Sequence, residues 1–152
     1  MKFRYFGIPQ IIAICFVGPV AWMALDRRPP LILYDGQLSP SKVQAGQTDV
    51  KVVWRAKFAG RDCGGLTQRE LIDSKRYLWP ALARSRAGIF QPDPNNKNEG
   101  TVVTPPLSIP DSMSPGRATY RVSQFYYCNA LQRIMQWPIV AVSPPIEFEV
   151  LP

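Results

Sequence analysis

Apolar and polar residues alternate along most of the chain after residue 28. In DVKVVWRAKF, residues 49–58, one face of an extended chain carries Val50, Val52, Trp54, Ala56 and Phe58, and the other carries the basic residues. The segments ATYRVSQFYYC, residues 118–128, and IEFEV, residues 146–150, alternate in the same way. Period-two alternation is typical of a strand with one buried face, so we predict a strand in each of these segments.

Weaker strand signals lie between these segments and are separated by turn residues. RELID and RYLW, residues 69–73 and 76–79, flank a turn at Asp73 and Ser74. TVVTPPLSIP, residues 101–110, is predicted as an edge strand because prolines cannot donate to a ladder, and residues 81–100 as one long polar loop. About six to eight short strands joined by turns indicate a mainly β protein, with an antiparallel β-sandwich domain over residues 29–152.

The first part of the chain has a different pattern. Residues 6–25, FGIPQIIAICFVGPVAWMAL, contain no charged side chain. A helix of that length is roughly 30 Å long, which matches the hydrocarbon core of a bilayer. We therefore predict that residues 1–28 form a membrane anchor, with a single transmembrane helix over about residues 6–25 in contact with lipid.

Two alternatives to the anchor are a buried helix of the domain core and a cleaved signal peptide. A signal peptide needs small residues before its cleavage site, and Trp22 occupies such a position if cleavage follows Ala24. Lys2 and Arg4 favour a cytoplasmic N-terminus only weakly, because Arg27 and Arg28 flank the other end.

The composition narrows the possible chemistry. The chain has 152 residues and no histidine, which removes Ser-His-Asp and Cys-His sites and the commonest zinc ligand sets. Its three cysteines are too few for a zinc site made of thiolates alone. We therefore predict that the protein is not an enzyme and has no catalytic residue, metal or cofactor. The net charge of +7 is compatible with contact to anionic surfaces and equally with solubility alone.

Two segments carry a resemblance to a known class of domain. SPSKVQAGQ, residues 39–47, and IPDSMSPGRATYRV, residues 109–122, resemble the opening and closing signatures of bacterial immunoglobulin-like modules. The resemblance covers residues 31–151 and implies an immunoglobulin-like sandwich. The whole layout, through RRPP to the CNALQR and WPI ending, also resembles small membrane-anchored proteins of bacterial phages and prophages, a group that has no assigned activity and so implies no site residues.

Cys63 and Cys128 are candidates for a disulfide. In a sandwich of this strand order the loops that contain them gather at the same end, so a bond between them is geometrically reasonable. The alternative is a pair of unrelated buried thiols. A disulfide persists in an oxidising compartment, which favours a single-pass protein of the bacterial inner membrane with its C-terminal domain in the periplasm. The inter-sheet disulfide of antibody domains is not carried over, because Cys63 lies beyond the end of its strand.

Two surfaces are candidates for partner binding. The first is the apolar loop that follows Cys128, with the candidate residues Leu131, Arg133, Ile134, Met135 and Trp137. The alternative for this loop is that it folds back and covers the disulfide. The second is a basic surface, with the candidate residues Arg55, Lys57, Arg61, Arg69, Lys75 and Arg76. Nucleic acid is not expected as a partner, because the aromatic residues nearby are better explained as core residues.

Two functions follow from these features. The first is a membrane-anchored envelope protein that presents an immunoglobulin-like binding or adaptor domain to an envelope or phage protein. The second is a structural accessory subunit that docks into a larger membrane complex through its transmembrane helix.

Overall fold

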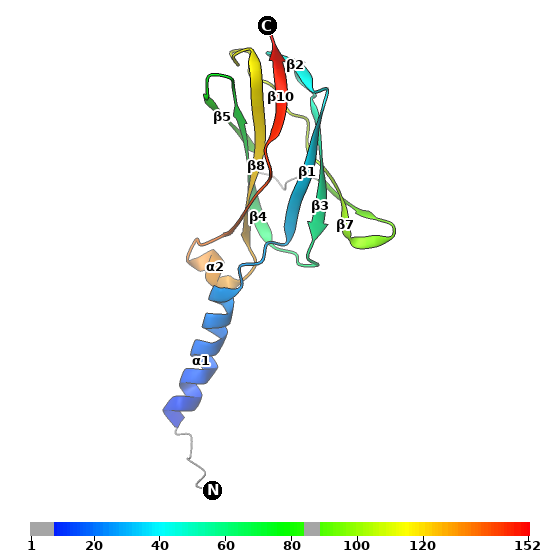
Figure 1. Ribbon diagram of the computed structural model, residues 1–152. Helices are drawn as coiled ribbons and strands as arrows, with labels where there is room; N and C mark the ends of the chain where they lie inside the picture. The colour runs from blue at the N-terminus through cyan, green and yellow to red at the C-terminus, as the bar shows by residue number, and fades with distance from the viewer. Residues whose placement is uncertain (1–7, 84–88) are drawn as a thin grey trace.

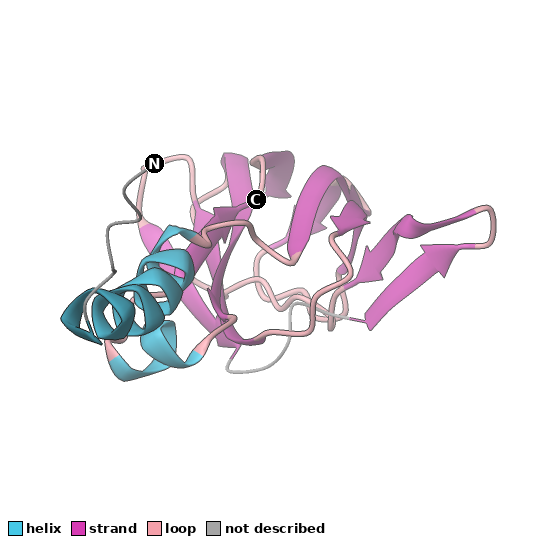
Figure 2. Cartoon of the chain, turned by 90° about the horizontal axis from the view of Figure 1, so that it is seen from below, coloured by secondary structure: helices cyan, strands magenta, loops and turns pink. Residues whose placement is uncertain are grey.

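The computed structural model describes residues 8–83 and 89–152, which form two β-sheets packed face to face with a helix at one end (Figure 1, Figure 2). Helix α1, Ile8–Leu25, extends away from the sandwich, and the C-terminus lies at the opposite end (Figure 1). A short helix, α2, Ala130–Ile134, lies where α1 meets the sandwich.

The first sheet has four strands in the order β1-β3-β7-β6, and its neighbours pair antiparallel. The strands are β1, Leu31–Ser39; β3, Lys51–Phe58; β7, Asn96–Val103; and β6, Ile89–Asp93. The β6–β7 hairpin projects from the side of the sandwich (Figure 1, Figure 2).

The second sheet has the order β2-β10-β8-β4-β5, with β9 also paired to β8. The strands are β2, Lys42–Gln44; β10, Ile146–Leu151; β8, Gly116–Tyr127; β4, Gly64–Ile72; β5, Leu78–Ala83; and β9, Ile139–Val142. β8 is the longest strand of the sheet, and two strands pair with the same edge of it. β10 pairs with residues 116–120 and β9 with residues 123–126.

The chain crosses from the first sheet to the second between Ser39 and Lys42, where β1 ends and β2 begins. β2 pairs parallel with β10, whereas the other named strand pairs are antiparallel. In the immunoglobulin convention, β1-β3-β7-β6 follows the order A-B-E-D and β10-β8-β4 follows G-F-C.

The core lies between the sheets and is built from alternate residues of their strands. Trp54 on β3, Leu71 on β4 and Tyr120 on β8 are among the largest fully buried side chains. The rings of Trp54 and Tyr120 lie 6.4 Å apart across the two sheets. Gly36 on β1 makes room for Trp54, because a Cβ at this position would overlap the indole ring. The alternation predicted for residues 49–58 and 118–128 is therefore the pattern that fills this core.

The predicted transmembrane helix is wrong. Within residues 8–83 and 89–152, no helix is long and apolar enough to cross a membrane. The fold class is therefore corrected to a mainly β protein with two sheets. The same finding removes the basis for two further predictions. These are the lipid contact through residues 6–25 and the single-pass location in the inner membrane with a periplasmic domain.

The segment predicted as one polar loop also needs correction. Parts of residues 81–100 belong to β5, β6 and β7, whereas residues 84–88 lie outside the described residues. The turn of the β6–β7 hairpin is held by Asp93, whose Oδ1 accepts a hydrogen bond from the Asn95 N–H at 2.7 Å. β7 pairs with β3 and with β6, so it is an interior strand and not the predicted edge strand. It ends at Val103, so the prolines at 105 and 106 lie outside it. The hairpin predicted around Asp73 and Ser74 is confirmed as β4–β5.

Candidate functional site

The segment between β8 and β9 forms a short helix at one end of the sandwich. Asn129 caps α2, since its side-chain oxygen accepts a hydrogen bond from the Gln132 N–H at 3.0 Å. Asparagine with an extended backbone is among the preferred residues at this position. At the other end, the Met135 N–H donates to the Leu131 carbonyl at 2.9 Å. The segment predicted as a loop is therefore partly helical.

Polar side chains of this segment hold the end of α1. The side chain of Gln132, only 1% exposed, donates through Nε2 to the Asp26 carbonyl at 2.8 Å and accepts from the Cys128 N–H at 2.8 Å. Asn129 Nδ2 donates to the Met23 carbonyl at 3.0 Å. These bonds satisfy carbonyl groups at the C-terminus of α1 that have no partner within the helix. The end of α1 is thus part of the folded domain.

Two arginines add to this junction. Arg61, in the loop between β3 and β4, donates through Nη1 to the Asp26 carboxylate at 2.7 Å, and its Nη2 bonds to the second carboxylate oxygen. Arg27 Nη1 donates to the Trp137 carbonyl at 3.3 Å, and its guanidinium lies 4.2 Å from the centre of the Trp137 ring. A cation over an indole face is attracted by the ring quadrupole. Residues far apart in the sequence therefore fix the direction of α1.

The ion pair gives a pH-dependent prediction. The hydrogen bond from Arg61 has the largest effect and lowers the pKa of Asp26 below its usual 3.8. Burial opposes this shift, and the charges of Arg61 and Arg28 lower the pKa further. The contribution of the Asp26–Arg61 pair to folding stability is thus complete above the pKa of Asp26 in the unfolded chain. It is lost as the pH falls through the lower pKa of Asp26 in the folded protein. An NMR titration of the Asp26 carboxyl carbon measures this, and Arg61→Gln should return the pKa toward 3.8. An unchanged pKa in Arg61→Gln would contradict the ion pair.

The structure joins Cys63 and Cys128, with their Cα atoms 4.5 Å apart. Cys63 immediately precedes β4 and Cys128 immediately follows β8, and Gly64 pairs with Tyr127 in the same ladder. The bond therefore joins two neighbouring strands of one sheet, unlike the inter-sheet bond of antibody domains. The Cys128 N–H also donates to the side chain of Gln132, which in turn bonds to the end of α1. Cys128 therefore belongs both to the disulfide and to the hydrogen bonds that join α2 to α1.

Large apolar side chains are exposed from the end of α2 through β9. Their exposed fractions are 78% for Ile134, 64% for Met135, 48% for Trp137, and 52% each for Val140 and Val142. In the ladders, Val140 lies opposite Phe125 of β8, which lies opposite Leu66 of β4, and Leu66 is also 52% exposed. We call Leu66, Ile134, Met135, Trp137, Val140 and Val142 the α2–β9 surface.

The predicted partner-binding residues divide between two roles. Ile134, Met135 and Trp137 are exposed and belong to the α2–β9 surface, and Arg133 is exposed beside them, whereas Leu131 is half-buried. The polar residues of the same segment, Asn129 and Gln132, face the end of α1. The segment thus both folds back onto the protein and presents apolar side chains to solvent.

The predicted basic surface is not one surface. Arg55 and Lys57 are exposed on β3 of the first sheet, and Lys75 and Arg76 lie in the β4–β5 turn of the second sheet. Arg61 is paired with Asp26, and Arg69 is buried between the sheets with an exposed fraction of 5%. Successive residues of a strand point to opposite faces and the strands belong to different sheets, so proximity in the sequence did not place these side chains together.

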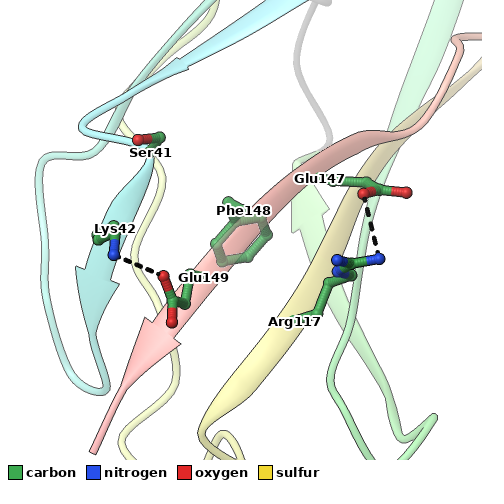
Figure 3. A pocket seen from close by; sticks show the side chains of 6 residues that line it. All are labelled: Ser41, Lys42, Arg117, Glu147, Phe148 and Glu149. Atoms are coloured by element: carbon green, nitrogen blue, oxygen red, sulfur yellow. Dashed lines mark ion pairs between the residues drawn. The ribbon is translucent and has the colours of Figure 1, made fainter.

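A pocket near the C-terminal end of the sandwich is lined by charged residues that neutralise one another. Figure 3 shows its lining residues, Ser41, Lys42, Arg117, Glu147, Phe148 and Glu149, around a volume of about 390 Å³. Lys42 Nζ lies 3.0 Å from Glu149 Oε2, and Arg117 Nη1 lies 4.0 Å from Glu147 Oε2. Exposed ion pairs of this kind contribute about 0–1 kcal/mol each. The pocket has no surplus charge that would select a ligand.

A second pocket of about 380 Å³ lies at the β4–β5 turn and contains one carboxylate, Asp73. Asp73 Oδ1 accepts hydrogen bonds from the N–H groups of Lys75 and Tyr77, both at 2.9 Å. Burial opposes ionisation of Asp73, but hydrogen bonds led by those of Tyr77 and Ser114 lower its pKa. Asp73 therefore stabilises the turn, and no second carboxylate of the described residues lines this pocket as acid–base catalysis by paired carboxylates would require.

Several residues of the site were not predicted from the sequence. Asn129 and Gln132 were treated as part of a loop, although Asn129 followed by ALQR is a signal for a helix cap. Val140 and Val142 lie on β9, and nothing in the sequence pattern shows that they are left uncovered. The pairing of Asp26 with Arg61 joins residues 35 positions apart and has no sequence signal.

Comparison with known proteins adds little to this description. No protein-family model matches the chain, and no curated protein matches it. Among solved structures, the chain is similar to the Pseudomonas fluorescens alkylpurine DNA glycosylase AlkC bound to DNA containing an abasic site analog. The match has 10% sequence identity and a TM-score of 0.49, and it covers 94% of this chain and 36% of that chain.

The comparisons do not support the predicted partners. The solved structure similar to this chain is bound to DNA, whereas nucleic acid was not expected as a partner of this chain. No comparison supports the predicted envelope or phage partner. A likeness at this TM-score carries no argument about what this chain binds.

Proposed function

We propose that this chain is a non-enzymatic binding or adaptor module that captures a partner protein through the α2–β9 surface. The observation that carries the proposal is the exposure of Ile134, Met135 and Trp137 beside the uncovered valines of β9. Isolated apolar residues are ordinary on a protein surface, but a contiguous group is typical of an interaction site. The buried Gln132 holds this surface to the end of α1, so it is presented on a fixed frame.

The residue types suit an interface centre. Met and aromatic residues are enriched at protein interfaces, and Trp is among the residues that most often dominate binding energy. Burying each large aliphatic side chain contributes about 1.5–3 kcal/mol. Ile134, Met135 and Val140 together would thus supply a sizeable part of the roughly 8 kcal/mol that corresponds to micromolar affinity.

Charges beside this surface indicate the chemistry of the partner. Arg133 is exposed and lies within 3.7 Å of the position that a Cβ at Gly64 would occupy, on the strand that carries Leu66. Arg27, Arg28 and Arg133 make no ion pair with the described residues, whereas Asp26 and Glu70 are paired. A partner segment with apolar anchors flanked by acidic side chains would complement this arrangement.

Helix α1 adds apolar side chains at the same end of the molecule. Val17, Val20, Trp22 and Leu25 are exposed on it. A helix that exposes large apolar groups is normally covered by other protein, which supports association at this end. The alternative function, docking into a membrane complex through a transmembrane helix, does not stand because it depended on that helix.

The test is a peptide-display selection on the immobilised full chain, followed by affinity measurements on the enriched peptides. We expect peptides with large apolar residues flanked by Asp or Glu. The double variant Ile134→Glu, Met135→Glu should weaken their binding at least tenfold, because it places two carboxylates where apolar and acidic groups would dock.

Ile32→Glu is the control, because Ile32 is an exposed apolar residue on β1 of the other sheet, with an exposed fraction of 48%. It should bind the selected peptides as the wild type does. Equal binding by the double variant and the wild type would overturn the proposal, as would a selection that enriches no peptide. Deleting the whole segment 129–137 would be a poorer test, because Asn129 and Gln132 also hold α1.

A further inference from the structure

Arg69 lies in the interior of the sandwich without a counter-ion. Its side chain projects from β4 toward the other sheet and is 5% exposed. Nη1 donates to the Pro105 carbonyl at 3.1 Å, whereas Nε and Nη2 have no hydrogen-bond acceptor. None of the ion pairs among the described residues includes Arg69. Buried arginines are normally paired, so this one requires an explanation.

Further donors without a partner surround Arg69. On β8, Val122 lies opposite Arg69, so Tyr120 and Gln124 are its diagonal neighbours on the same inner face. Both side chains are buried, and the Tyr120 hydroxyl and Gln124 Nε2 have no hydrogen-bond partner. Burial raises the pKa of Tyr120 to about 12, so the hydroxyl keeps its proton and can donate at neutral pH.

Trp54 reaches the same region from the other sheet. Its ring packs 6.4 Å from that of Tyr120, and Nε1 also has no hydrogen-bond partner. The Cε3–Cζ3 edge of the indole faces Gly36 on β1, so Nε1, on the opposite edge, faces away from β1. We call Trp54, Arg69, Tyr120 and Gln124 the donor cluster. The buried indole nitrogen of Trp79 also has no hydrogen-bond partner but is not included, because Trp79 lines the pocket at the β4–β5 turn.

We propose that the donor cluster binds one small inorganic anion inside the sandwich. The atoms without partners are N–H groups and one hydroxyl, and the site carries a full positive charge on Arg69. Buried water molecules would satisfy hydrogen bonds, but they would leave this charge uncompensated in a medium of low dielectric constant. An anion supplies both acceptors and the opposite charge, and guanidinium groups are well suited to binding one.

The first test measures thermal unfolding of the wild-type chain at constant ionic strength. Sodium gluconate is replaced stepwise by sodium chloride in one series and by sodium phosphate in another. An anion whose free concentration is about 100 times its dissociation constant raises the folding equilibrium constant about 100-fold. This corresponds to a rise in Tm of roughly 5–10 °C. A response to chloride assigns a halide, and a response to phosphate assigns a tetrahedral oxyanion. A Tm that changes in neither series overturns the proposal.

Two further measurements locate the site. Arg69→Met should abolish the anion-dependent rise in Tm, whereas Arg55→Met, which removes an exposed arginine of β3, should keep it. A rise that survives in Arg69→Met overturns the assignment. Should that variant fail to fold, wild-type crystals grown with the responsive anion, as bromide where it is chloride, decide the question. Density for the anion beside Arg69 Nε and Nη2 supports the site, and density elsewhere or none overturns it. Neither result depends on partner binding at the α2–β9 surface.

Discussion

Replacing both cysteines of the disulfide, Cys63→Ala with Cys128→Ala, is expected to lower the free energy of unfolding by about 4 kcal/mol. The bond closes a loop with a sequence separation of 65 residues, and a loop of this size restricts the unfolded chain strongly. For a chain of this length the change corresponds to a fall in Tm of roughly 8–16 °C. Urea unfolding of the variant and of the wild type, without reductant, measures the difference.

Cys15→Ala is the control for this experiment. Cys15 is exposed on α1 and forms no disulfide, so its replacement should leave the unfolding free energy within about 0.5 kcal/mol of the wild type. Adding a reductant should destabilise the wild type and the Cys15→Ala variant, but not the double variant. A double variant as stable as the wild type would show that the bond does not constrain the unfolded chain.

The β-sandwich was predictable because its strands bury only one face. Trp54 and Tyr120 fall on the inner face of their strands, and the alternation around them is visible in the sequence. The β6–β7 hairpin was not predictable in the same way, because β6 and β7 are polar and exposed over much of their length. Prolines after Thr104 were taken to mark an edge strand, but β7 ends before them and lies inside its sheet.

The candidate site was only partly predictable for a different reason. The apolar character of Ile134, Met135 and Trp137 is local, and the sequence shows it directly. Whether such side chains are covered depends on contacts with distant segments, such as Arg27 over Trp137. Arg69 shows the same limit in the opposite direction, since it was predicted as part of a basic surface and lies in the core.

The contact between α2 and α1 depends most on Gln132. Its side chain is buried and makes one hydrogen bond to the Cys128 N–H and another to the Asp26 carbonyl. Gln132→Leu keeps a similar volume but leaves both backbone groups without these partners. An unsatisfied buried polar group costs about 1–3 kcal/mol, so the free energy of unfolding should fall by roughly 2–4 kcal/mol.

Stability alone would not show that Gln132 holds α1, so the decisive measurement is amide hydrogen exchange. The Asp26 N–H, which donates to the Trp22 carbonyl at 3.0 Å, should exchange faster in Gln132→Leu than the loss of global stability requires, because the end of α1 opens locally. Gln136→Leu is the matched control, since the Gln136 side chain bonds only within its own segment, to the Arg133 carbonyl at 2.7 Å. It should leave this exchange unchanged. If Gln132→Leu accelerates the exchange of all protected amides equally, α1 is not held by this residue, and the α2–β9 surface has no fixed frame from α1.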